Sequence, residues 1–589
     1  MVRATFAGFT TAVSALQANQ KRLDITGQNL SNMNTPGYTR QALQVSSVNY
    51  TNPISHYMNG SEVAVGFGVH MDKVTQIRDP YLDIQYRNQM DKSGYTDAMQ
   101  ATLDRLSDVF DETSIQGIHQ AFLDIRSTLE NQHDPSKVHD PIFEAELRSR
   151  MQTLTNLLND AYRQVEEAEK VEYSKLDGRG TNEQGSVEQI NEILRQIGGL
   201  NRQIKQNQIF GQQSLELMDE RNLLLDKLSS YIPIEVTYYK DINYDGNDDG
   251  IIYDYDSKGN IIGKRDWPDD LRVEMVYQDK DGNTQKLTLV EGTIGSKDDN
   301  YGSVVFTKDT GYLDDPSKTS LTFKGFGRDT NGNLLPNKQS IEFDSPVFKT
   351  DANGTTAEVG NHFADGSGSI QSSLDMLWKD GITEKITDKR GYGYYKAELD
   401  TLAKSFAEVI NGINAQGTQQ GDAFKLLVNK MDDSTDDISA KNIGISLGWQ
   451  GGTTHIGTST DRNPDMNATV LNLLEAMKTT YPTDSFLDPD GKKLFDDVDL
   501  KDNSFADYMN HVSTILANDS YRNATNLKTN VTVLNGIQNS RDSVSGVSLD
   551  EEASNMMMYM SAYNASSRLM TTLDQALDVL INSTGVVGR

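Results

Sequence analysis

One segment of the chain places acidic and amide side chains at the spacing of a calcium-binding loop. Its candidate oxygen ligands, at positions 1, 3, 5 and 12 of the loop, are Asp245, Asn247, Asp249 and Asp256. Calcium prefers several hard oxygen ligands in a flexible ring, and Gly250 at position 6 would supply the turn. Two features differ from the usual motif: position 12 is Asp rather than a bidentate Glu, and no flanking helix pair is expected. The segment is therefore either a calcium loop or a plain acidic turn.

Outside that loop, the residue types offer little for catalysis or for a cofactor. The chain has 8 His, and the closest pair, His133 and His139, stands among Asp-Pro steps that are typical of a loop between helices. The sequence contains no HExxH, GxSxG, phosphate-loop or dinucleotide-binding motif. It also contains no cysteine, which removes disulfides, thiolate metal ligands and a cysteine nucleophile. We therefore expect a protein that is not an enzyme and carries no cofactor.

Bulk composition narrows the classes of partner. With 589 residues the chain is long enough for several domains. It has 55 Lys and Arg against 85 Asp and Glu, a net charge of −30, which repels nucleic-acid phosphates and anionic lipid. No run of eighteen apolar residues is present to span a membrane, and Gly8 and Thr10 interrupt the N-terminal segment too early for a cleaved signal peptide. We expect no nucleic-acid partner and no membrane attachment.

The more informative pattern lies at the two ends of the chain, where apolar residues follow the spacing of a coiled-coil seam. Near the N-terminus, alternating steps of three and four residues, interrupted by polar Gln20, link Phe6, Phe9, Val13, Leu16 and Leu23. A turn marked by Asn34, Pro36 and Gly37 follows, so we expect the first helix to end near Asn29.

The C-terminal end repeats this arrangement. Ser548 and Glu551 have the spacing of a capping box, in which each side chain bonds the other's backbone amide at a helix start. The seam that follows consists of Ala553, Met556, Met560, Tyr563, Ser567 and Met570, widened by Leu569, Leu573, Leu577 and Leu580. A helix with one apolar stripe gains little stability alone. The two ends therefore pair with each other or with the ends of neighbouring subunits.

Between the ends, helical periodicity surrounds a region rich in β-formers. Further helices are expected near 96–111, 115–131, 141–174, 395–414, 467–480 and 504–530, and an extended segment near 63–77. From about Ile232 to Gln371, β-formers alternate with Gly, Asn and Asp turns such as Asp281-Gly282. The predicted fold is mainly α with an inserted β domain. Its parts are a terminal helical assembly domain (1–45 and 548–589), an elongated multi-helix body (46–232 and 371–547) and a β-rich middle domain (233–370).

Four motifs carry a family resemblance. Residues 29–40 (NLSNMNTPGYTR) resemble the signature shared by the rod, hook and hook-associated proteins of the flagellar axis, and residues 543–553 (SVSGVSLDEEA) resemble a matching C-terminal signature. Residues 217–228 (LMDERNLLLDKL) and 399–414 are similar to two internal helices of flagellar hook-associated protein 1. The four motifs in this order indicate that family, and the likeness covers roughly 1–232 and 384–589.

The resemblance implies a structural role in the bacterial flagellum. It implies a secreted subunit of the junction between hook and filament, required for filament assembly and motility, that passes unfolded through the flagellar type III export channel without a cleaved signal peptide. The implied partners are further copies in a ring, the hook protein, the second junction protein (hook-associated protein 3), and an export chaperone for the C-terminal helix. The terminal helices would order only against their neighbours.

Two alternatives are weighed against this reading. The hook protein itself would lack the helix at 217–228, and a secreted surface adhesin would carry a terminal anchor, for which residues 582–589 give no pattern. The assembly interface is expected at both seams and the turn, namely Phe6, Phe9, Val13, Leu16, Leu23, Asn34, Pro36, Gly37, Met556, Met560, Tyr563, Met570, Leu573, Leu577 and Leu580.

Overall fold

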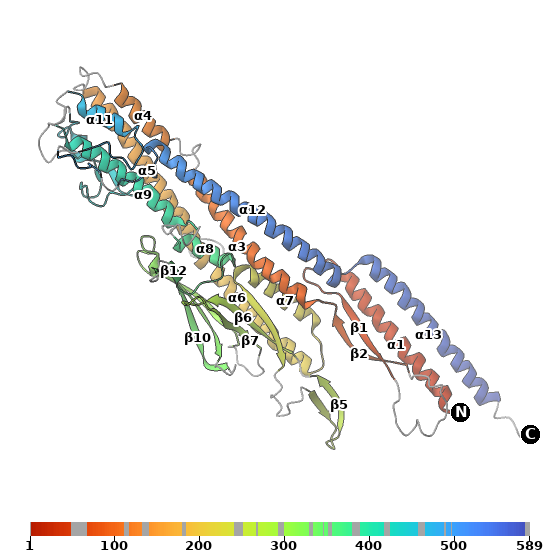
Figure 1. The fold of residues 1–589 in the computed structure, drawn as a ribbon. Helices are drawn as coiled ribbons and strands as arrows, with labels where there is room; N and C mark the ends of the chain where they lie inside the picture. Colours follow the sequence, from red (N-terminus) through yellow and green to blue (C-terminus); the bar gives the residue numbers. More distant parts are fainter. Residues whose placement is uncertain are drawn as a thin grey trace, which may run out of the picture.

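The protein is a long rod of helices with a β-sheet region against one side, and both termini lie together at one end (Figure 1). The computed structural model describes residues 2–48, 68–110, 117–131, 141–178, 184–240, 251–266, 269–292, 300–328, 334–345, 347–350, 356–379, 389–417, 425–457, 466–487, 490–495 and 498–583. The architecture confirms the predicted fold class, mainly α with a β region inserted in mid-chain.

The end that holds the termini consists of two long helices and a hairpin. Helix α1 (Val2–Ser31) packs along α13 (Leu549–Ser583). Strands β1 (Gln41–Ser47) and β2 (Val69–Gln76) form an antiparallel hairpin beside α1. We call α1, α13 and this hairpin the terminal unit. The extended segment predicted near 63–77 coincides with β2, whereas no prediction covered β1.

The body is a bundle of helices that runs away from the terminal unit (Figure 1). Its helices are α3 (Pro80–Phe110), α4 (Ile118–Glu130), α5 (Pro141–Asp177), α6 (Ser186–Ile209), α7 (Leu215–Tyr231), α8 (Ser369–Trp378), α9 (Tyr392–Ala415), α11 (Ala468–Ala476) and α12 (Phe505–Ser545). At the far tip, β13 (Leu427–Asn429) pairs with β14 (Ile443–Ile445), and the short α10 (Leu447–Gly451) buries Trp449 completely.

Three helices differ from the predictions because parts of their sequences lack an apolar periodicity. Helix α3 begins at Pro80, well before 96, and α12 continues to Ser545, well beyond 530. In these added segments the contact between the two helices is made largely by polar groups, so an apolar periodicity is missing. For example, the Asn530 carbonyl accepts a hydrogen bond from Gln89 Nε2 (3.1 Å). The unpredicted α8 is buried at every position after Ser369 and therefore has no exposed face to give a period.

The inserted region folds as an antiparallel sheet in the strand order β10-β9-β7-β6-β3, with β8 also paired to β9. The strands are β3 (Ile234–Lys240), β6 (Asp269–Gln278), β7 (Thr284–Glu291), β8 (Ser303–Lys308), β9 (Thr319–Arg328) and β10 (Leu334–Asp344). Two small hairpins, β4 (Ile251–Tyr255) with β5 (Ile261–Asp266) and β11 (Val347–Thr350) with β12 (Thr356–Val359), extend from it. The predicted Asp281-Gly282 turn is confirmed between β6 and β7, with Gly282 at φ +77°.

The body and the sheet share one apolar core. A continuous cluster of buried side chains runs from the tip of the helical bundle into the inner face of the sheet. There the rings of Phe323, Phe343 and Phe363 pack in tilted and edge-to-face arrangements, with their centres within 5.6 Å of one another. Among the described helices, none is long and apolar enough to cross a membrane.

Candidate assembly surface and the joint behind it

The two terminal helices run antiparallel, and two contacts fix their alignment. Gly8 of α1 lies against Leu573 of α13, whose methyl groups would be 3.4 Å from a Cβ added at the glycine. About four turns further along α1, the Arg22 guanidinium lies 5.4 Å from the centre of the Tyr559 ring. The ends of the chain therefore pair with each other, which was one of the two alternatives from the sequence.

On α1 the apolar side chains buried deepest are not the predicted seam. They are Ala12, Ala18 and Ile25, which are 1%, 2% and 7% exposed. The helix is covered on one side by α13 and on a second side by the hairpin, through contacts such as Val69 N–H to Ser14 Oγ (3.3 Å). Among the predicted residues, those that are half-buried are Phe9, Leu16 and Leu23, while Val13 is exposed. The side chain of Phe6 lies outside the described residues.

On α13 the predicted residues divide between two sides of the helix. Five are half-buried on the side facing α1: Met556, Tyr563, Met570, Leu573 and Leu577. Met560 and Leu580 are exposed. A separate exposed stripe, at spacings of seven and four residues, consists of Met558, Ala565, Leu569, Ala576 and Leu580. At 100° per residue, this stripe lies about a quarter turn around α13 from the side facing α1.

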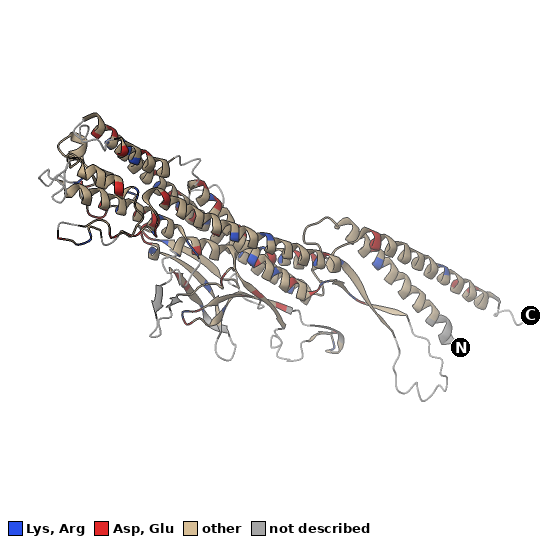
Figure 2. Ribbon diagram, turned by 45° about the horizontal axis from the view of Figure 1, so that its top comes forward, with Lys and Arg blue, Asp and Glu red and all other residues tan. Residues whose placement is uncertain are grey.

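The charged residues leave most of the terminal unit bare. In Figure 2, the helices that end at N and C are drawn largely in neither charge colour, whereas Lys, Arg, Asp and Glu recur along the body. Large apolar side chains on one helix face with few charges beside them are typical of a surface that another chain covers. The exposed stripe is therefore the candidate assembly surface.

The turn after α1 is held by a residue that our sequence analysis did not select. Asn34, Pro36 and Gly37 are all exposed, and Gly37 takes φ +79°, a conformation that favours glycine. Asn29, by contrast, is 1% exposed. Its side-chain amide donates to the Gln41 carbonyl and accepts from the Gln41 amide, both at 3.0 Å, as a neighbouring strand would.

The Tyr38 hydroxyl completes this turn by donating to Asn29 Oδ1 (2.9 Å). Burial and the nearby carboxylates of Glu216 and Asp219 raise the pKa of Tyr38 to about 12, so the hydroxyl keeps its proton and remains a donor. Asn29 and Tyr38 both lie inside the 29–40 signature. One signal in the sequence could have identified Asn29, because it is a polar residue in the last turn of a helix that carries an apolar stripe.

Behind the turn, the next residues anchor the terminal unit to the body. Thr39 donates its hydroxyl (2.6 Å) and its backbone amide (3.0 Å) to the two carboxylate oxygens of Asp219 on α7. Burial raises the pKa of Asp219, while the Thr39 hydrogen bonds oppose that rise. We call the region where residues 32–40, 77–79 and 546–548 cross between the terminal unit and the body the joint.

Arg40 then closes the joint onto α13. Its guanidinium bonds Glu551 (2.7 Å) and Glu552 (2.8 Å), of which Glu552 is almost fully buried, and its backbone amide donates to the Ser545 carbonyl (2.9 Å). This arrangement corrects the predicted capping box in one half. The Ser548 hydroxyl does lie 3.5 Å from the Glu551 amide, but the Glu551 carboxylate bonds Arg40 in the structure.

The candidate calcium loop is only partly described. Asp245, Asn247 and Asp249 lie outside the described residues, as do His133 and His139. Asp256 follows β4, and its Oδ1 accepts the backbone amides of Lys258 and Asn260, both at 2.8 Å. These hydrogen bonds, led by the Asn260 side chain, lower the pKa of Asp256, as expected for a residue that closes a tight turn. Within the described ranges, no three His, Asp or Glu side chains gather as metal ligands would.

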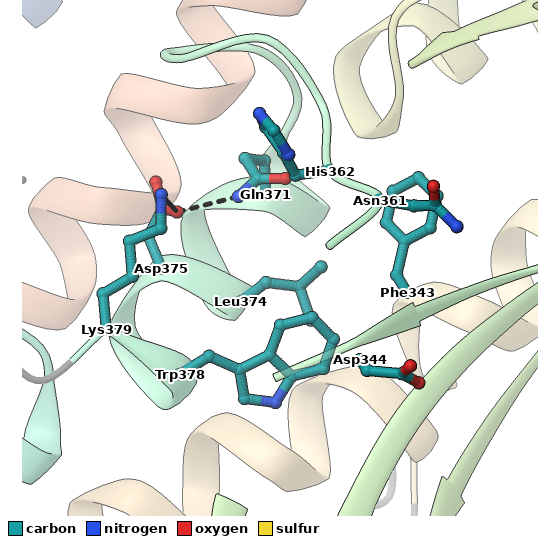
Figure 3. Close-up of a pocket in the computed structure, with 9 residues that line it drawn as sticks. All are labelled: Phe343, Asp344, Asn361, His362, Gln371, Leu374, Asp375, Trp378 and Lys379. Atoms are coloured by element: carbon teal, nitrogen blue, oxygen red, sulfur yellow. Dashed lines mark hydrogen bonds and ion pairs between the residues drawn. The ribbon is translucent and has the colours of Figure 1, made fainter. Parts of the chain in front are cut away.

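A pocket between the sheet and α8 is too small for a ligand. Figure 3 shows its lining, in which His362 lies beside Gln371, Asn361 lies beside Phe343, and Trp378 lies below Leu374. The cavity measures about 10 Å³, which is room for one water molecule. Behind it, the fully buried Asp375 accepts hydrogen bonds from Tyr95, Gln371 and Lys389 at 2.6 to 2.7 Å. These groups join α3 to α8 and are fully engaged in that structural role.

Comparison with known families places both ends of the chain in one class. Residues 9–39, which include α1 and its turn, match the family described as flagella basal body rod protein. Residues 538–583, the end of α12 with α13, match the C-terminal family of the flagellar basal body rod FlgEFG proteins. The terminal unit is thus that of a flagellar axial protein.

The remainder of the chain narrows the class. Residues 103–304 match the flagellar hook-associated protein FlgK helical domain. Flagellar hook-associated protein 1 of Bacillus subtilis (strain 168) is 27% identical over 99% of this chain and 99% of its own. The proteins of that name from Salmonella typhimurium (strain LT2) and Escherichia coli (strain K12) are each 24% identical over 97% of this chain and 98% of their own. The chain is thus similar over its full length to flagellar hook-associated protein 1, and it is a structural component of the flagellum.

Two further findings complete the comparison. The alignments run through the whole chain, so the likeness is not confined to 1–232 and 384–589 as the sequence motifs suggested. The structure of the flagellar hook junction protein FlgK from Burkholderia pseudomallei matches 57% of this chain and 44% of its own chain, with 19% identity and a TM-score of 0.32.

Proposed function

We propose that this protein forms the junction between the flagellar hook and filament by assembling into a ring through its terminal unit. The observation that carries the proposal is the exposed apolar stripe on α13, where Met558, Leu569 and Leu580 are 55%, 47% and 50% exposed. Burying a side chain of this size contributes about 1.5–3 kcal/mol. A helix pair gains this free energy only when further chains cover it.

The proposed interface combines the exposed stripe with the residues predicted from sequence. Side chains that already pack between α1 and α13, such as Leu573, would hold the pair together, and exposed ones, such as Val13 and Met560, would contact neighbouring subunits. The outer half of the pair contacts the hairpin, as at Ser14, and extends away from the helical body (Figure 1). We propose that this half is loose in the free subunit and orders during assembly, because ordering backbone costs about 1–2 kcal/mol per residue.

Partners follow from the same surface and from the family. They are further copies of this chain, the hook protein, the second junction protein (hook-associated protein 3), and an export chaperone that covers α13 before assembly. The proposed location is outside the cell, at the junction, after export without a cleaved signal peptide. The proposed role is structural and not enzymatic, which the likeness to flagellar structural proteins supports.

We also propose the division into a terminal assembly domain (1–45 and 548–589), a helical body (46–232 and 371–547) and a β-rich domain (233–370). The crossing at residues 546–548 supports the first boundary on its C-terminal side, whereas on its N-terminal side the hairpin of β1 and β2 packs beside α1 and belongs with the terminal domain. At the second boundary, the chain passes from α7 into β3 near Pro233 and returns through α8.

Antibody labelling of purified flagella tests the proposed location. Under electron microscopy, the label should form one band per flagellum between hook and filament, and a strain lacking the gene should have hooks without filaments. Label along the whole hook would support the hook-protein alternative. Label spread over the cell surface would support the adhesin alternative.

A further inference from the structure

We propose that a buried chain of alternating arginines and aspartates at the joint is a latch that fixes a single angle between the terminal unit and the body. The latch consists of Arg87, Asp226, Arg541, Asp83, Arg78 and Asp219. This inference concerns the free subunit, so it stands or falls independently of where the protein acts.

The centre of the latch is Arg541, one turn before the end of α12. Its Nη1 lies 2.6 Å from Asp226 Oδ2 on α7, and its Nε lies 3.1 Å from Asp83 Oδ1 on α3. The guanidinium also lies over the Tyr86 ring, 4.8 Å from its centre. One side chain thus holds three body helices together where they meet the terminal unit.

Ion pairs continue the chain in both directions from these aspartates. Asp226 also accepts from Arg87 Nε (2.9 Å). On the other side, Arg78 bonds Asp83 (2.5 Å) and lies 3.8 Å from Asp219. Because Asp219 accepts from Thr39, and the next residue, Arg40, binds α13, the bonds run without a gap from the body to the terminal unit.

Burial explains why this network specifies one geometry. All six latch side chains are 15% exposed or less, and their three positive charges balance three negative charges. Removing one partner from a buried ion network leaves an uncompensated charge, so alternative arrangements that separate the pairs are strongly disfavoured. Ion pairs are also directional, whereas apolar contacts tolerate sliding.

The apolar core does not reach the joint. Within the described chain, the continuous core cluster includes no residue before Tyr95 and none after Leu516. The latch therefore replaces hydrophobic packing at the place where the terminal unit joins the body. The linker starts on the last turn of α12, where the Gly546 amide donates to the Asp542 carbonyl (2.8 Å).

The absence of cysteine allows a direct measurement, because labels attach only where a cysteine is introduced. Spin labels at Lys528→Cys on α12 and Asn564→Cys on α13, both exposed positions, report the angle across the joint by electron–electron double resonance. We expect one narrow distance distribution in the full-length monomer. In Arg541→Met, the distribution should roughly double in width, because the terminal unit then pivots about the joint.

Two controls separate a released latch from a general loss of structure. A second label pair within the body, Ala101→Cys with Lys528→Cys, should stay narrow in Arg541→Met. Arg163→Met, which removes an exposed ion pair on α5, should leave the joint distribution unchanged.

The inference is overturned if the joint distribution in Arg541→Met matches that of the unaltered chain, or if the unaltered chain is already as broad as the variant. If Arg541→Met also broadens the distance distribution of the label pair within the body, the same two measurements are made on Asp226→Asn and judged by the same outcomes. That substitution removes the charge but keeps the shape of the side chain.

Discussion

Asp91 on α3 makes the stability of the body depend on pH. The side chain is buried, and its Oδ1 has no hydrogen-bond partner in the protein. Burial raises the pKa of this carboxyl from its ordinary value of 3.8 to about 7, and the hydroxyl of Ser367 offsets the rise only in part. The folded protein therefore holds a proton on Asp91 over a range of pH in which the unfolded chain has released it.

The sign and size of the effect follow from that difference. Below about pH 4, Asp91 is protonated in both states and contributes nothing to the pH dependence. Between about pH 4 and 7 only the unfolded chain loses the proton, so the free energy of unfolding falls by about 1.4 kcal/mol per pH unit. The total loss of free energy of unfolding reaches at most about 4 kcal/mol near neutral pH. Above pH 7 the contribution of Asp91 is constant.

Asp91→Asn removes this pH dependence because the amide does not titrate. At about pH 8 we expect the variant to be more stable by about 2 kcal/mol, less than the full figure because the buried amide costs about 1–3 kcal/mol if its hydrogens find no acceptor. Urea unfolding at several pH values measures both quantities when it is followed by tryptophan fluorescence, to which Trp378 on the neighbouring α8 contributes.

Asp375→Asn is the matched control. Burial would raise the pKa of Asp375, but Lys389 and Lys379 outweigh it and lower the pKa, so this carboxylate is stabilising when charged. The Asp375 variant should lose stability near neutral pH, opposite to the Asp91 variant. If Asp91→Asn kept the pH dependence of the unaltered protein, the assignment of the raised pKa to buried Asp91 would be wrong.

Three further changes probe the joint and the loops. Gly546→Ala should destabilise the last turn of α12 because the added carbon meets the Asp542 carbonyl. Gly536→Ala, in open space within α12, should instead stabilise the protein by up to about 1 kcal/mol, and thermal melts of the two variants measure both effects. Asn29→Ala should speed hydrogen exchange of the Gln41 amide at least about tenfold, corresponding to about 1.4 kcal/mol for the lost bond, and exchange at an unchanged rate would show that Asn29 does not hold the turn. Removing calcium with a chelator should leave the melting temperature unchanged if the segment ending at Asp256 is a plain turn, and a clear fall would identify it as a calcium loop.

The sequence predicted those parts of the fold where apolar residues follow a regular spacing. The terminal helices, the long α5 and the alternation of β-formers with turns in the inserted region were all found this way. The antiparallel pairing of α1 with α13 remained one of two choices, because seam spacing alone does not name the partner helix.

The joint could not be predicted because polar residues build it. Asp83, Arg87 and Asp226 are buried on helix faces that a periodicity search reads as solvent-exposed. Their partners lie far away in the chain, as with Asp226 and Arg541, and only the folded backbone brings them together. Ala12 and Ala18 escaped notice for a different reason: their small side chains contribute little apolar signal, although both are almost fully buried.

The proposal that the exposed stripe of α13 assembles the flagellar junction can be examined with one substitution. Leu569→Asp places a charge in the middle of that stripe, on a side chain that is 47% exposed in the monomer. Leu471→Asp makes the same chemical change at an exposed position on α11, far from the terminal unit. Each variant is expressed in a strain lacking the gene, filaments are counted by electron microscopy, and the melting temperature of the purified monomer is recorded.

We expect the Leu569 variant to form no filaments while its monomer melts at the temperature of the unaltered protein, because the side chain buries little until neighbours cover it. The Leu471 variant should restore filaments. Filaments restored by Leu569→Asp would contradict the proposed assembly surface, and a large fall in its melting temperature would show that the stripe already packs within the free subunit.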